Sequence, residues 1–179
     1  MTQAGSVYGE ALYDLAKSEG LSHRILQELE VLAESFRREP EFLRLLSAPN
    51  VSKAERCAVL DASFEGKVHP YVLNFLKLLT EKGYARHFAD CCAAYRTHYN
   101  LDNGILPVRA VTAVPLNQAQ TQKLTAKLSE LTGKTVQLTN HVDPEILGGV
   151  RLDYDGRRVD DTVANRLASI GTLLKNTVL

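Results

Sequence analysis

Four aspartates near the C-terminal end, Asp153, Asp155, Asp160 and Asp161, come closest to residues that could do chemistry. Clustered carboxylates can exchange protons in acid-base catalysis or bind Mg²⁺. Each also fits a structural position, because Asp155 precedes a glycine in a turn, and Asp160 or Asp161 can cap a helix that follows. No base is paired with a nucleophile or an orienting group. The sequence therefore predicts no catalytic residue. A small nucleotide- or metal-binding domain built on these aspartates is the alternative function.

His87, Cys91 and His98 are the second candidate, since their spacing places them on one face of a helix, as metal ligands can be. One helix rarely supplies a closed tetrahedral site, and no second cluster of ligands accompanies them. A buried cysteine between half-exposed histidines explains the spacing better. We expect no metal site.

Glycine patterns that bind phosphate are also missing from the sequence. Gly148-Gly149 precedes a predicted strand and does not open a helix, as a nucleotide-binding loop would. Neither a serine elbow nor a Cys/His nucleophile pattern is present. The expectation is a binding protein without a cofactor.

The C-terminal part that carries these residues has mixed periodicity. Alternating residues predict strands over 106–114, 135–142 and 150–154, and a short return strand over 157–159 follows the Asp155-Gly156 turn. A capping pair, Asn117 and Gln120, starts a helix that Gly133 ends and that carries an apolar stripe of Leu124, Leu128 and Leu131. A final helix is predicted from an apolar stripe of Val163, Leu167, Ile170 and Leu174.

The N-terminal part has the helical period up to Asn103-Gly104. Ser22 is the expected cap of the second helix, Pro40 and Pro70 fit the first turns of the third and fifth, and Ser52 begins a capping box. The expected fold is mainly α with a small α+β domain: an N-terminal six-helix bundle over residues 1–104, then a strand-helix-strand-hairpin-helix domain over residues 105–179.

Composition narrows the possible partners. The chain has 179 residues, with 21 Lys plus Arg and 21 Asp plus Glu, so no basic surface favours nucleic acid. Cys57, Cys91 and Cys92 suggest no disulfide framework. No signal peptide is visible, and no apolar run approaches the ~20 residues that span a bilayer, so we expect a soluble chain that is not exported and does not insert into a membrane.

The C-terminal segment combines these turn, strand and helix signals in a fixed order. Its characteristic residues are Leu147, Gly148, Gly149, Val150, Asp155, Gly156, Asp161, Val163 and Leu167. This ordered combination resembles the signature of the delta subunit of F-type ATP synthases, the bacterial counterpart of the mitochondrial oligomycin-sensitivity-conferring subunit. Relatives usually carry serine where this chain has Thr162.

The resemblance implies a non-catalytic stator subunit on the cytoplasmic face of the bacterial inner membrane. Its N-terminal bundle would bind the N-terminal segments of the alpha subunits, and its C-terminal domain would join the b subunits of the peripheral stalk. The first and fifth helices have more apolar surface than one packing contact buries, which predicts a groove for a partner helix. The predicted groove residues are Tyr8, Ala11, Leu12, Leu15, Val72, Phe75, Leu76 and Leu79.

Overall fold

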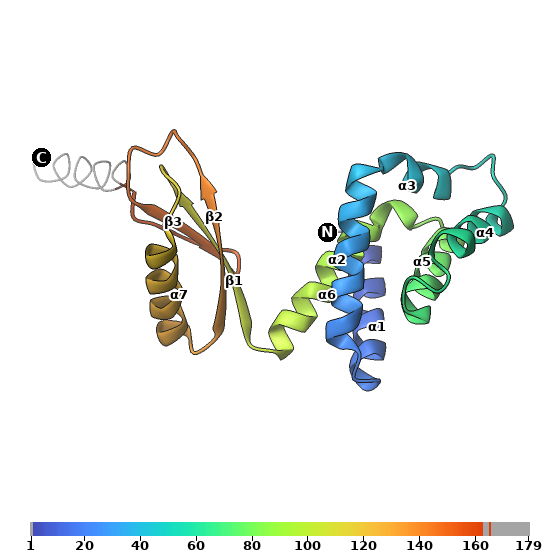
Figure 1. Cartoon of the computed structure of the whole chain (residues 1–179), viewed down its shortest axis with the longest axis horizontal. Helices are drawn as coiled ribbons and strands as arrows, with labels where there is room; N and C mark the ends of the chain where they lie inside the picture. The colour runs from blue at the N-terminus through green and yellow to red at the C-terminus, as the bar shows by residue number, and fades with distance from the viewer. Residues whose placement is uncertain (1, 163–164, 166–179) are drawn as a thin grey trace, which may run out of the picture. The chain divides into compact units, whose positions relative to one another are not determined.

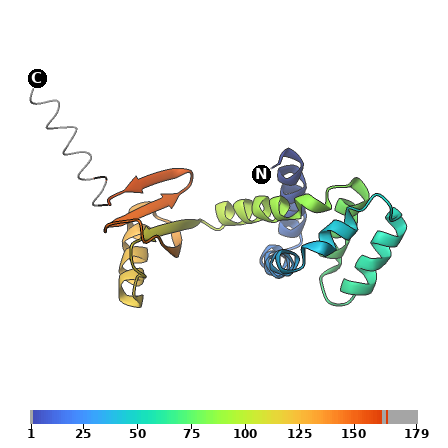
Figure 2. The ribbon, with the colours of Figure 1, turned by 90° about the horizontal axis from the view of Figure 1, so that it is seen from above.

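The computed structural model describes residues 2–162 and 165 of the chain (Figure 1). The protein is mainly helical, with a small four-stranded mixed sheet. It divides into two compact units, residues 1–99 and residues 100–179. Helices make up the described part of the first unit, whereas strands and one covering helix dominate the second (Figure 2).

The helices of the first unit follow one another with short connections. They are α1 (Gln3–Ser18), α2 (Ser22–Arg38), α3 (Pro40–Leu46), α4 (Lys53–Phe64), α5 (Pro70–Lys82), the 3₁₀ turn η1 (Ala85–His87) and α6 (Phe88–Asp102).

Local capping explains where most of these helices begin and end. Ser52 and Glu55 form the predicted capping box of α4, and Gly83 ends α5 in the left-handed conformation at φ 78°. The predicted cap of α2 was wrong. Leu21 holds the N-cap position and Ser22 is already helical, because the Leu21 carbonyl accepts the N–H of Ile25 and begins the helical ladder.

One apolar core holds the helical unit together, with Tyr95, Phe88, Ile25 and Leu60 among its fully buried side chains. Val7, Leu12 and Leu15 belong to the apolar stripe of α1, but the face of α1 that packs on this core is a different one. Of these three residues only Leu12 is buried, whereas Val7 is 59% and Leu15 42% exposed. The residues that α1 buries are Gly5, Gly9, Leu12, Tyr13 and Ala16.

Small residues explain this choice of face. A Cβ added to Gly9 would lie 2.4 Å from the Cys91 carbonyl oxygen and 2.7 Å from the Ala94 Cβ. The backbones of α1 and α6 therefore approach more closely than any side chain on α1 would permit.

The second unit contains β1 (Ile105–Thr112), α7 (Gln118–Thr132), β2 (Thr135–Val142), β3 (Val150–Tyr154) and β4 (Arg157–Asp160). Its strand order is β2-β1-β3-β4. β1 pairs in parallel with β2 and antiparallel with β3, and β3 pairs antiparallel with β4. Residues 155 and 156 join β3 to β4, with positive φ angles of 47° and 70°.

Two expectations for this unit were wrong in detail. β1 ends at Thr112 and not at Val114, because the Thr112 hydroxyl donates to the Val114 carbonyl and turns the chain. The apolar stripe of α7 is also shorter than predicted, since Leu128 packs against Leu106, Val108 and Val136 whereas Leu131 is 71% exposed. α7 lies along the sheet (Figure 1). The predicted final helix lies outside the described residues.

Candidate partner-binding surface

An open apolar hollow of about 380 Å³ lies between α1 and α5. The side chains that line the hollow are mostly apolar, and their polar groups are the Asn74 amide and the tyrosine hydroxyls. The lining residues are Tyr8, Ala11, Leu12 and Leu15 from α1 and Tyr71, Asn74, Phe75 and Leu78 from α5.

The two helices line the hollow with the same spacing. On each, four residues at positions i, i+3, i+4 and i+7 form one narrow stripe along the axis, beginning at Tyr8 on α1 and at Tyr71 on α5. This is the spacing with which two helices receive an apolar stripe of a third. Ala11 and Leu15 remain exposed, whereas Leu12 is buried and Tyr8 is half-buried, so the described part of the chain removes only part of the α1 stripe from water.

The predicted groove residues divide between this hollow and the core. Tyr8, Ala11, Leu12, Leu15 and Phe75 line the hollow. Val72, Leu76 and Leu79 are instead buried in the core, with exposed fractions of 0%, 2% and 1%.

Tyr71, Asn74 and Leu78 line the hollow but were absent from the prediction. α5 is apolar around most of its circumference, so its hydrophobic pattern does not select a face. The spacing of the lining residues on α1 recurs on α5, and this recurrence identifies Tyr71, Asn74 and Leu78.

Hydrogen bonds fix the start of α5 and thereby position Tyr71. The His69 backbone N–H donates to Glu28 Oε2 at 2.6 Å, which ties this end to α2. His69 Nδ1 accepts the N–H of Tyr71 at 3.2 Å and acts as the N-cap. On the α1 side, the ring of Tyr8 contacts that of Tyr84, with centroids 5.7 Å apart.

α1 is fixed at its own start by Asp90 of α6. Asp90 Oδ2 accepts the Thr2 hydroxyl at 2.8 Å and the Thr2 N–H at 2.9 Å, and these bonds hold the pKa of the Asp90 carboxyl below its usual range. The Thr2 hydroxyl in turn accepts the N–H of Gly5 as the N-cap of α1.

Several of the C-terminal signature residues lie in a turn or in a close backbone contact of the second unit. Gly149, at φ 89°, passes beside the chain that follows β4: a Cβ there would lie 2.4 Å from the Asp161 carbonyl oxygen. Asp155 and Gly156 form the turn between β3 and β4, and Leu147 is 78% exposed. Val163 and Leu167 lie outside the described residues.

The aspartates near this signature are engaged in local contacts. Asp153 accepts a hydrogen bond from Arg158 at 2.8 Å, and Asp160 accepts the hydroxyl of Thr162 at 2.7 Å. Thr162 Oγ1 accepts the Asn165 N–H at 3.4 Å, a hydrogen bond typical of an N-cap. These contacts stabilise the turn and its flanks.

The predicted metal-ligand candidates, His87 in η1 and Cys91 and His98 in α6, do not come together. Burial raises the pKa of the Cys91 thiol to about 11, and the His98 ring stacks on Tyr13. Among the described residues, no three His, Cys, Asp or Glu side chains are placed to bind a metal ion together. Of the helices described, none is long and apolar enough to cross a membrane.

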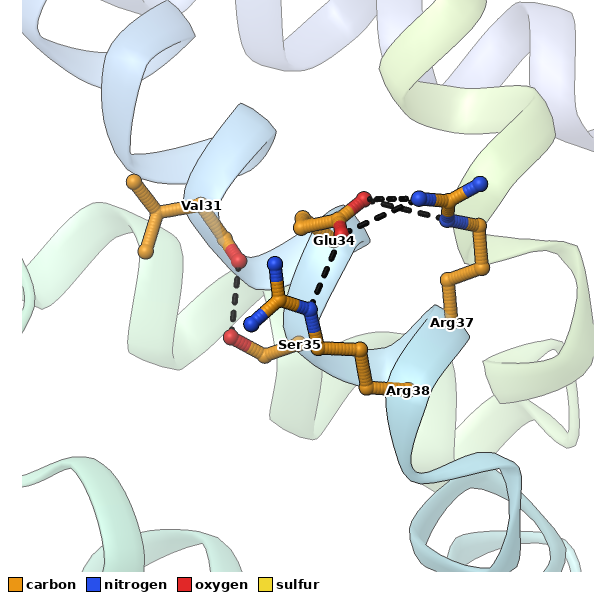
Figure 3. A network of polar contacts seen from close by, with 5 residues as sticks. All are labelled: Val31, Glu34, Ser35, Arg37 and Arg38. Atoms are coloured by element: carbon orange, nitrogen blue, oxygen red, sulfur yellow. Dashed lines mark hydrogen bonds and ion pairs between the residues drawn. The ribbon is translucent and has the colours of Figure 1, made fainter.

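A charged network marks a different face of the helical unit, at the end of α2 (Figure 3). Glu34 accepts hydrogen bonds from Arg37 at 3.0 Å and from Arg38 at 2.9 Å. Val31, whose carbonyl accepts the Ser35 hydroxyl, is 67% exposed beside it. These exposed i,i+3 and i,i+4 ion pairs stabilise the end of the helix modestly.

Comparisons with known proteins agree with the C-terminal signature and extend it to the whole chain. The chain is 33% identical over 163 residues to the ATP synthase subunit delta of Alkaliphilus oremlandii, covering 91% of both chains. It is 34% identical over 172 residues to that of Parabacteroides distasonis, covering 96% of both.

A solved structure shares the fold over nearly the whole length. One chain of the cryo-EM structure of the Toxoplasma gondii mitochondrial ATP synthase hexamer superposes with a TM-score of 0.74 at 21% identity, covering 97% of this chain and 98% of that one. The family model for the ATP synthase delta (OSCP) subunit matches residues 5–174. The chain therefore belongs to the ATP synthase delta (OSCP) subunit family.

Proposed function

We propose that this chain, as a non-catalytic stator subunit, connects the catalytic head of an F-type ATP synthase to its peripheral stalk. The head is then held against the torque of the rotor, and proton-driven rotation is coupled to ATP synthesis. The observation that carries the head-binding half of the proposal is the apolar hollow between α1 and α5, with its two stripes of identical spacing.

The hollow favours an amphipathic helix as its partner. Each lining stripe extends over two helical turns, from Tyr8 to Leu15 and from Tyr71 to Leu78, so it matches the apolar face of a short helix. We assign this partner to the N-terminal segment of an alpha subunit. The half-buried Tyr8 and Tyr71 supply the aromatic surface that binding hot spots commonly contain.

The second unit is assigned to the b subunits of the stalk. The division into two cores supports a proposed architecture in which a six-helix bundle, residues 1–104, is followed by a strand-helix-strand-hairpin-helix domain, residues 105–179. Two separate cores allow each domain to hold one partner. The protein would act at the cytoplasmic face of the bacterial inner membrane, without inserting into it.

A charge placed in the hollow tests the head-binding assignment. Ala11→Asp and Leu78→Asp change exposed lining residues, and Leu78 is 38% exposed, so neither variant places a charge in the core. We expect each to weaken binding of an alpha N-terminal peptide by about 2 kcal/mol, roughly 30-fold, because a carboxylate would be desolvated without a partner. Fluorescence anisotropy of the labelled peptide measures the affinity.

Val31→Asp is the matched control, because it introduces the same charge at an exposed apolar residue of α2 beside the Glu34 network (Figure 3). Its affinity should equal that of the parent, and all variants should keep the parent's thermal midpoint within a few degrees. Folded hollow variants that bind the peptide as the parent does would show that alpha binds elsewhere.

A further inference from the structure

β2 is an outermost strand of the sheet, and one of its two backbone edges is open. It pairs with β1 along all 8 of its residues in an uninterrupted parallel register. The N–H of Thr135 donates to the Gly104 carbonyl on the β1 side, so the odd-numbered residues of β2 direct their backbone groups to β1 and the even-numbered residues direct theirs outward. Within the described residues, the outward N–H groups of Leu138 and Asn140 have no hydrogen-bond partner. An extended chain beside β2 would satisfy them.

The features that usually protect an edge strand are missing from β2. Soluble proteins block such edges with charged side chains, proline, a bulge or a short strand. The sequence of β2 contains neither Lys, Arg, Asp, Glu nor Pro, and its pairing with β1 has no bulge. The other edge strand, β4, has only 4 residues, and three of them are Arg157, Arg158 and Asp160. The Ser129 hydroxyl oxygen accepts the N–H of Val136 at 3.3 Å, which covers only the first outward position of β2.

The charges at the two ends of β2 favour a second copy of this chain as the strand that pairs with it. Lys134 directly precedes β2, whereas Asp143 directly follows it and Glu145 comes soon after. An antiparallel second copy places the basic end of each β2 beside the acidic end of the other, so both ends of the contact gain an attraction. A parallel copy would place like charges together. The uncharged residues between the two ends add no repulsion.

We propose that two free copies of this chain associate by antiparallel pairing of their β2 strands, with Thr139 of one copy facing Thr139 of the other. In this register Leu138 exchanges two backbone hydrogen bonds with Asn140 of the second copy, and the two-fold symmetry repeats the exchange. Gln137 faces His141 of the second copy, so exposed and uncharged side chains meet along the contact. Two threonines opposite each other are a favourable cross-strand pair. The pairing concerns the free chain and does not depend on the stator assignment.

A lysine at the symmetry axis tests the pairing. Thr139→Lys places two ammonium groups opposite each other, and Thr139 is exposed, so the charge does not enter the core. Thr97→Lys in α6 is the matched control, because Thr97 is also exposed and also donates its hydroxyl to a backbone carbonyl. The contact of one strand is smaller than a standard interface, so we expect the parent to dimerise with a dissociation constant on the order of 100 µM. Sedimentation equilibrium should show the same dimer in Thr97→Lys and at least about tenfold weaker association in Thr139→Lys.

Disulfide trapping tests the register without any added charge. In a Cys57→Ser background, where the remaining cysteines are buried, Thr139→Cys places two thiols directly opposite each other. The Cα atoms of such a pair lie about 4.5 Å apart, which a disulfide can bridge. Gln137→Cys is the control on the same face of the same strand, because its counterpart lies four residues along the second copy, about 13 Å away. Mild oxidation should therefore link Thr139→Cys into covalent dimers much faster than Gln137→Cys.

Three results would overturn the pairing. A parent that stays monomeric up to about 1 mM does not associate through β2. A folded Thr139→Lys variant that dimerises as the parent does would place the contact elsewhere, and equal trapping of Thr139→Cys and Gln137→Cys would exclude the register. If Thr139→Lys does not fold, the trapping comparison decides. Neither measurement includes an alpha or b subunit, so a negative result leaves the proposed function standing.

Discussion

Asp90 shows how one carboxylate links two helices through a short segment of chain. Its Oδ2 atom holds the N–H and the hydroxyl of Thr2, and that hydroxyl caps α1. Removing the negative charge weakens both bonds at once, because an ionised acceptor binds donors more strongly than a neutral one. Residues of α1 form one wall of the hollow proposed to bind a partner helix, so we expect this single residue to act on both stability and binding.

The first prediction is a pH dependence. Since the pKa of Asp90 in the folded state lies below its ordinary value of 3.8, its contribution is complete above about pH 4 and is lost as the pH falls through the lowered pKa. Thermal unfolding of the parent and of Asp90→Asn should therefore differ most at neutral pH, with the parent more stable, and should converge toward pH 2. A difference that is constant from pH 7 to pH 2 would contradict the role of the ionised carboxylate.

For individual residues, the sequence predicted structural positions better than it predicted which other residues of the chain they contact. The carboxylate next to Gly156 indicated a turn, and Asp155 and Gly156 form one. The hydrogen bond from the Asn165 N–H to Thr162 was not predicted, nor was the close approach of Gly149 to Asp161 and Thr162. That contact joins residues that no local pattern connects.

The packing of α1 against α6 belongs to the scale of elements. The contact depends on glycine at two positions one turn apart, Gly5 and Gly9, where an added Cβ would lie 2.5 Å from the Asp90 Cβ and 2.4 Å from the Cys91 carbonyl oxygen. Glycine normally weakens a helix interior, so its presence here reflects the close approach of a neighbour.

Gly9→Ala should therefore destabilise the protein by about 2 kcal/mol, although alanine is the better helix former. The obstacle is a backbone carbonyl, which can move only if α6 moves. Glu10→Ala, at the exposed neighbouring position, is the control and should be neutral or slightly stabilising. Urea denaturation followed by circular dichroism measures both. A Gly9→Ala variant as stable as the control would mean that the two helices can separate freely.

The packing of α1 against α6 also shows why sequence patterns predicted where the helices lie in the chain but not which face of each helix is buried. Prolines, capping boxes and glycines mark the helix ends by local chemistry, and α4, α5 and α7 begin as predicted at Lys53, Pro70 and Gln118. The buried face of α1 is chosen by small residues, which carry no hydrophobic signal. The apolar stripe that periodicity detects on α1 is largely the one that lines the hollow, so all four groove residues predicted on α1 line it, whereas on α5 only Phe75 does.

At the scale of the whole molecule, membership of the delta (OSCP) family confirms the predicted non-catalytic stator subunit. The mainly helical composition with a small sheet was predictable from the change of period after Gly104. The parallel pairing of β1 with β2 and the central place of β1 were not, because strand order depends on contacts between distant residues.

The last prediction concerns independence of the helical part. A fragment of residues 1–104 keeps α6 complete and retains the buried Tyr95 and Phe88, so it should unfold cooperatively on heating, with a midpoint near that of the helical part in the full chain. A fragment ending at residue 94 loses Tyr95, which is 0% exposed, and serves as the unfolded control. A gradual, non-cooperative transition in the longer fragment would show that the helices need the sheet.

The strand order has a consequence for synthesis on the ribosome. β1 is the first strand to emerge, yet Ile105 pairs with Thr135 and Val108 with Tyr154, so its neighbours arrive much later in translation. The helices before it need no residue of the sheet for their core. Domains fold as units, and strands that are distant in sequence pair slowly. The helical unit of the nascent chain can therefore be folded while β1 is still unpaired and accessible to chaperones. The unit proposed to bind the head would then be folded before the unit proposed to bind the stalk has been made.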